Sequence, residues 1–99
     1  MRITFEQTGG FAGMTITKVF DTSTLPEKET KRLRQLVEAA AFFNLPASLT
    51  SDTPHPDSFE YLITVEEDGN QHTVEVSESA APANLTPLLE WLRMQVRRR

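Results

Sequence analysis

Two stretches near the start of the chain alternate between apolar and polar side chains, as a strand with one buried face does. They are residues 2–7 and residues 14–20. Between them, residues 8–13 contain three glycines around Phe11. This pattern predicts a β-hairpin whose turn is longer than two residues. The apolar positions that share a face in the two strands are Ile3 and Phe5, then Met14, Ile16 and Phe20.

From Glu27 to about Asn44 the spacing of apolar residues changes to the i, i+3, i+4 pattern of a helix with one buried face. The residues on that face are Leu33, Leu36, Val37, Ala40 and Phe43. Thr24 and Glu27 have the spacing of a capping box at its start. Pro46 predicts the end of the helix, because a residue that precedes proline avoids the α region.

Alternation returns in residues 59–65 and 71–76, which predict two more strands. The Asp68-Gly69 pair between them is a strong hairpin signal. His72 stands among apolar residues on its strand and is expected to be partly buried and hydrogen-bonded. A second helix is expected to begin at Thr86, with Pro87 in its first turn. Its apolar face comprises Leu85, Leu88, Leu89, Leu92 and Val96.

The expected fold is α+β, with the order ββαββα in a single domain spanning residues 1–99. It consists of a four-stranded, mainly antiparallel sheet with two helices packed on one face. This topology brings the glycine-rich turn 8–13 and the proline-rich loop 46–57 to one end of the sheet. Asp68-Gly69 and Met1 are expected at the opposite end.

Composition limits the functions that the chain can have. The net charge of −4 disfavours general nucleic-acid binding, which needs a basic surface. The arginines at 97–99 are read as a solvated tail at a helix end, the alternative being contact with an acidic partner. There is no apolar run long enough to span a membrane. With no cysteine and no hydrophobic signal at the start, a cytoplasmic protein that is monomeric when free is expected.

The sequence contains no pattern typical of an enzyme. Its two histidines, His55 and His72, have no partner at metal-ligand spacing, so no metal and no cofactor is expected. The glycine-rich segment 9–13 leads into a strand, whereas a phosphate site needs the start of a helix. No nucleophile elbow is present. These observations favour a binding protein without catalytic residues.

Four segments together resemble emfourin, a family of small bacterial inhibitors of protealysin and related thermolysin-like zinc metalloproteases. They are Gly-Gly-Phe-Ala-Gly at 9–13, Ala-Phe-Phe-Asn-Leu-Pro at 41–46, Phe-Glu-Tyr-Leu-Ile-Thr-Val at 59–65 and Gln-His-Thr-Val at 71–74. The likeness extends over nearly the whole chain. It implies a non-covalent, reversible protein inhibitor whose partner is a thermolysin-like metalloprotease. The rival interpretation is a protein–protein interaction module that inhibits nothing.

The inhibitory residues are predicted from the chemistry of the loops, since an inhibitor must fill a cleft that binds extended substrates. Thermolysin-like enzymes prefer a bulky apolar residue just after the scissile bond, and Phe11 is the best such side chain that the loops offer. The alternative is that Phe11 folds back onto the core. The predicted protease-binding residues are Gly9, Gly10, Phe11, Ala12, Gly13, Asp52, Pro54 and His55.

Overall fold

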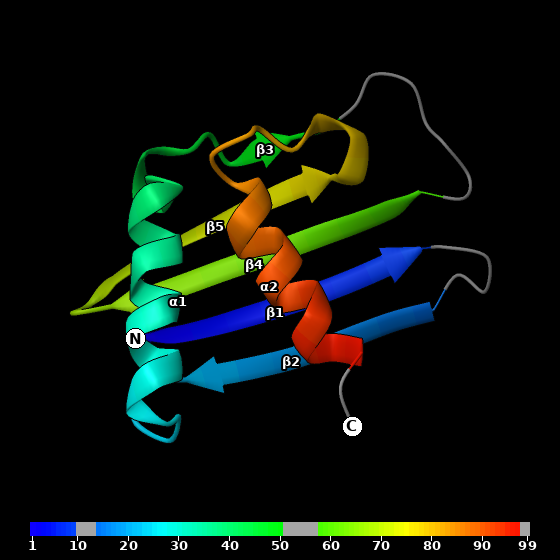
Figure 1. Cartoon of the computed structure of the whole chain (residues 1–99). Helices are drawn as coiled ribbons and strands as arrows, with labels where there is room; N and C mark the ends of the chain where they lie inside the picture. Colours follow the sequence, from blue (N-terminus) through cyan, green and yellow to red (C-terminus); the bar gives the residue numbers. More distant parts are fainter. Residues whose placement is uncertain (10–13, 51–57, 98–99) are drawn as a thin grey trace.

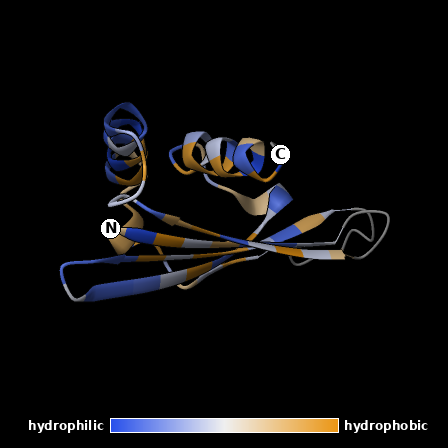
Figure 2. Cartoon of the chain, turned by 90° about the horizontal axis from the view of Figure 1, so that it is seen from below, coloured by the Kyte–Doolittle hydropathy of each residue, from blue (hydrophilic) through white to orange (hydrophobic). Residues whose placement is uncertain are grey.

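A five-stranded sheet forms one layer of the molecule, and two helices form the other (Figures 1 and 2). The computed structural model describes residues 1–9, 14–50 and 58–97. The strands are β1 (Arg2–Gly9), β2 (Met14–Asp21), β3 (Ser48–Leu49), β4 (Phe59–Glu67) and β5 (Asn70–Ser77). The helices are α1 (Glu27–Ala39) and α2 (Thr86–Arg97), and the 3-10 helices are η1 (Phe42–Asn44) and η2 (Glu78–Ala80).

The strands lie in the order β2-β1-β4-β5-β3. β1 pairs antiparallel with β2 and with β4, and β4 pairs antiparallel with β5. The prediction of four strands in the order ββαββα was wrong, because the two residues of β3 add a fifth strand parallel to β5. Ser48 and Leu49 are too few to show an alternating pattern, so periodicity alone does not reveal this strand.

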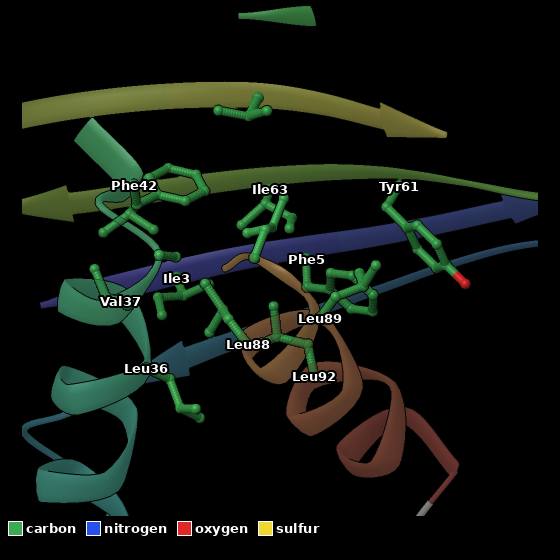
Figure 3. Packing of buried hydrophobic residues seen from close by; sticks show 14 of the residues in the cluster. Ile3, Phe5, Leu36, Val37, Phe42, Tyr61, Ile63, Leu88, Leu89 and Leu92 are labelled. Atoms are coloured by element: carbon green, nitrogen blue, oxygen red, sulfur yellow. The ribbon is translucent and has the colours of Figure 1, made fainter. Parts of the chain in front are cut away.

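Both helices cover the same face of the sheet, as predicted (Figure 2). α2 crosses the strands, and its residues Leu88, Leu89 and Leu92 point toward Phe5 and Ile63 (Figure 3). At the other side of the core, Leu36 and Val37 of α1 are also buried. The core is therefore a single apolar layer between sheet and helices. No helix in the described part of the chain is both long and apolar enough to cross a membrane.

α1 ends five residues earlier than the apolar spacing indicates. Ala41 adopts a left-handed conformation with φ 49°, and η1 follows it. The break turns Phe42 into the core, where it is 1% exposed, and leaves Phe43 40% exposed. Phe43 was expected on the buried face, so that prediction was wrong. The apolar period did not show the break because Phe42 and Phe43 are adjacent, and either one can supply the buried ring.

The start of α1 also differs from the prediction. Thr24 does not cap the helix, because its hydroxyl donates to the Asp21 carbonyl oxygen at 2.9 Å. Asp21 organises this turn through its carboxylate, which accepts hydrogen bonds from the Ser23 hydroxyl at 2.7 Å and the Ser23 N–H at 2.9 Å. These two bonds are the main reason why the pKa of Asp21 is lowered. Pro26 directly precedes the helix.

Candidate functional site

One end of the sheet gathers the residues that flank the two loops predicted to bind a protease. Gly9, at the end of β1, pairs with Met14 of β2 and with Phe59 of β4. The end of β3 reaches the same end of the sheet, since Leu49 pairs with Val76 near the end of β5. We call this the loop end and define it by Gly9, Met14, Thr50, Ser58 and Ser77. It confirms the predicted convergence for the described residues (Figure 1).

Of the predicted protease-binding residues, Gly9 lies in the described part of the chain. Gly10, Phe11, Ala12, Gly13, Asp52, Pro54 and His55 lie outside the described residues. The structure therefore shows where the chain enters and leaves both segments.

Gly9 occupies a position that a residue with a side chain fills only with strain. Its φ is +108°, a conformation that L-residues rarely adopt. A Cβ atom at this position would lie 2.6 Å from the carbonyl oxygen of Ser58. The close approach sets the end of β1 directly against the residue that follows loop segment 51–57. Because Gly9 has no side chain, the stems of the two loops can lie this close together.

Stacked aromatic rings support the loop end from the helix side. The Phe59 and Tyr61 rings stack with their centroids 6.2 Å apart, and Tyr61 in turn stacks on Phe5 at 5.6 Å. The guanidinium of Arg93 lies 5.7 Å from the centroids of both Phe59 and Tyr61. Arg93 also pairs with Glu78 of η2 at 3.6 Å. This network ties α2 to the strand that begins at the loop end.

Sequence reasoning missed the role of Arg93 in this network. Its side chain is 25% exposed because its planar guanidinium covers the aromatic rings. The sequence contains a weak signal for this contact, since Phe59 and Tyr61 share a strand face that the apolar side of α2 must cover. Which arginine of α2 reaches that face depends on the crossing angle of the helix, which periodicity does not give.

The Tyr61 hydroxyl is buried and has no hydrogen-bond partner within the described residues. Its residue is 1% exposed, at the end of the core that lies farthest from α1 in Figure 3. Burial raises the pKa of the Tyr61 phenol to about 12, while the positive charge of Arg93 acts in the opposite direction. The phenol therefore stays neutral at physiological pH.

The opposite end of the sheet is acidic. A hollow of about 250 Å³ there is lined by Met1, Arg2, Asp21, Glu66, Glu67, Asp68 and Gly69. Arg34 of α1 pairs with Glu67, and Arg2 pairs with Asp21 at 3.7 Å. Met1 and Asp68-Gly69 were predicted at this end, and the register confirms it. Within the described residues, no three His, Asp or Glu side chains are placed to hold a metal ion.

His72 lies near the acidic end, two residues after β5 begins, and has a structural contact. Its Nε2 is 2.7 Å from the carbonyl oxygen of Leu45, and its ring packs edge-on against Phe42 at 5.7 Å. It is partly buried, as predicted. The bond joins β5 to the segment that follows η1. The register places His72 toward the end of the sheet opposite the loop end.

Comparison with known proteins connects this geometry to one family. The Emfourin family model matches residues 5–93 of the 99-residue chain. The match includes most of β1, both loops, the loop end and most of α2. Searches of curated proteins and of solved structures returned no match.

Proposed function

Because the chain belongs to the Emfourin family, whose members have a general role as protease inhibitors, we propose that it reversibly inhibits a thermolysin-like zinc metalloprotease of the protealysin type. The inhibitor blocks the substrate cleft with a wedge formed by loop residues 10–13 and 51–57. The observation that carries this proposal is the loop end, where the stems of both loops lie on neighbouring strands. Two loops on one rigid base fill a cleft better than one loop alone.

Phe11 is the proposed anchor of this wedge. Burial of a phenylalanine side chain contributes roughly 1.5–3 kcal/mol. A nanomolar complex needs about 12 kcal/mol, so further contacts must add to this anchor. Asp52, Pro54 and His55 in the second loop supply them in our proposal, and the two prolines at 54 and 56 stiffen that loop against cleavage.

The energetic reason for the rigid base is preorganisation. A flexible loop loses conformational entropy when it binds, and that loss subtracts from affinity. The contact of Gly9 with Ser58 and the Arg93 stack on Phe59 both restrict the base of the loops before binding. The proposed inhibition is non-covalent and involves no catalytic residue of this chain. A cytoplasmic, monomeric free protein stays part of the proposal.

The test is a titration of a thermolysin-like protease with this protein, with hydrolysis of a small peptide substrate as the readout. We expect stoichiometric loss of activity, reversal on dilution, and recovery of the inhibitor uncut. The protein should be assayed against several enzymes of this class and against a serine protease as a control. Full activity of every metalloprotease, or rapid cleavage of the protein, would contradict the proposal and leave the interaction module as the remaining interpretation.

A further inference from the structure

β2 forms one edge of the sheet, and the direction of its backbone groups follows from the register (Figure 1). The Thr22 N–H donates to the Met1 carbonyl oxygen at 3.0 Å, so these two residues form a hydrogen-bonded pair. Hydrogen-bonded pairs alternate along an antiparallel ladder. Even-numbered residues of β2 therefore bond to β1, while Thr15, Thr17, Val19 and Asp21 direct N–H and C=O groups away from the sheet.

This edge lacks the features by which proteins protect an exposed strand. Proline, a bulge or an outward lysine usually blocks pairing with another chain. β2 contains no proline, and its register with β1 is continuous over all eight residues. Its one lysine, Lys18, turns toward the helix layer, where its amino group donates to the Gln95 carbonyl oxygen at 3.0 Å. No strand among the described residues pairs with this edge from Thr15 to Val19.

The apolar side chains of β2 are also unusually exposed. Met14 is 64% exposed, Ile16 39% and Val19 55%. Met14 and Ile16 share a face with the buried Phe20, but the contacts of α2 with this strand are at Phe20, through Trp91, and at Lys18, through Gln95. The exposed part begins at Met14, which belongs to the loop end. A partner bound at the loops can therefore also contact this edge, since Thr17 is only about 10 Å from Met14 along the strand.

A second copy of the chain fits this edge poorly. In an antiparallel pair of β2 strands, the outward-facing odd-numbered residues must lie opposite each other, which puts the helices of both copies on the same face. α2 reaches β2 through its contact with Lys18 and ends at Arg97, which two more arginines follow in the sequence. The junction would bring together like charges from the two helix ends.

We propose that the β2 edge adds a strand to an extended segment of the protease at its substrate cleft. This inference rests on the proposed inhibitory function and specifies how the inhibitor docks. Backbone groups of Thr15 and Thr17 pair with the enzyme segment, and the side chains of Met14 and Ile16 cover it from the helix side. Main-chain pairing of this kind supplies affinity largely independent of side-chain sequence.

The test uses proline and valine at position 17 of the full-length protein. Thr17→Pro removes an outward N–H and leaves the hydrogen bonds to β1 in place, and an edge strand tolerates proline. Thr17→Val changes the side chain and keeps the N–H. One lost backbone hydrogen bond predicts inhibition weaker by about fivefold or more for Thr17→Pro. Thr17→Val loses no backbone hydrogen bond, so it should inhibit within about twofold of the original protein.

Amide hydrogen exchange of the unmodified protein tests the pairing of the β2 edge even if Thr17→Pro fails to fold. In the protease complex, the Thr15 and Thr17 amides should exchange at least tenfold more slowly than in the free protein. Unchanged exchange there, equal inhibition by Thr17→Pro, or equal weakening by Thr17→Val would each overturn the edge pairing while the proposed function stands. If the original protein is a dimer and Thr17→Pro dissociates it, the edge pairs with a second copy of the chain instead of the protease. Absence of inhibition by the original protein would instead remove the proposed function itself.

Discussion

Gly9 and Ser58 touch so closely that no side chain fits between them. A Cβ atom on Gly9 would lie 2.6 Å from the Ser58 carbonyl oxygen. The contact joins two segments that are far apart in sequence, because Gly9 precedes the first loop and Ser58 follows the second. Any displacement of one stem is therefore transmitted to the other.

Gly9→Ala should destabilise the protein by about 2 kcal/mol or more, because it adds left-handed strain and a backbone clash. The same change should weaken inhibition by about tenfold, since separation of the stems alters the shape of the wedge. Thermal unfolding and the inhibition constant measure the two effects. An inhibition constant that stays at its original value in the folded variant would show that the spacing of the stems is irrelevant to binding.

Gly69→Ala is the matched control. Gly69 also has a positive φ, +80°, but a Cβ atom there would meet no atom within 4 Å. It lies in the Asp68-Gly69 turn at the opposite end of the sheet. We expect a loss of about 1 kcal/mol in stability from the conformation alone, with inhibition unchanged. Weakened inhibition in this variant would place part of the binding site at the acidic end.

Phe11→Ala should weaken inhibition at least tenfold and leave the fold intact, because it removes the proposed anchor, worth roughly 1.5–3 kcal/mol. Phe43→Ala provides the control, since Phe43 is also partly exposed, at 40%, and contacts Phe42 and His72 instead of the loop end. The control should inhibit like the original protein. If the two variants inhibit equally well, Phe11 is not the anchor, and the end with Met1 and Asp68-Gly69 becomes the next candidate.

Hydrophobic periodicity predicted those parts of the fold in which one face of an element is covered along its length. Both hairpins, both helices and the face that the helices cover agree with the structure. The alternation in β2 was a weaker guide, because Met14 and Ile16 share the face of Phe20 and stay exposed. Burial on that face depends on where α2 crosses, and a strand does not carry this information in its own sequence.

The convergence of the two loop stems at one end of the sheet was predicted, and the contacts that hold these stems were not. The order of hairpins and helices was enough to bring Gly9 and Ser58 to one end of the sheet. The role of Arg93 depends on tertiary packing between α2 and Phe59, for which the shared strand face of Phe59 and Tyr61 is only a weak signal. Gly9 was recognised as a turn residue, but its contact with the Ser58 carbonyl oxygen requires the pairing of β1 with β4.

Ala41→Gly should stabilise the protein slightly. A left-handed conformation costs a residue with a side chain about 1–2 kcal/mol, and Ala41 has φ 49°. Glycine avoids that cost, although it gains backbone entropy in the unfolded chain worth about 0.5–1 kcal/mol. The net gain in unfolding free energy should be up to about 1 kcal/mol. Ala39→Gly, at the exposed last residue of α1, should instead lose up to about 1 kcal/mol. A loss in both variants, measured by urea unfolding, would contradict the strain at Ala41.

The stability of the protein should depend on pH in alkaline solution through Tyr61. Burial raises the pKa of its phenol from 10.0 to about 12. Between these two values the unfolded chain has lost the phenol proton and the folded chain retains it, so stability must fall as pH rises from 10 to 12. The slope from this group is at most about 1.4 kcal/mol per pH unit.

Because Tyr61 is the sole tyrosine, absorbance at the phenolate band reports its titration directly. Tyr61→Phe should remove this part of the pH dependence and cost little stability at neutral pH, because the hydroxyl has no hydrogen-bond partner among the described residues. A phenolate midpoint near 10 in the folded protein would show that water reaches the hydroxyl and that the core is open at this end.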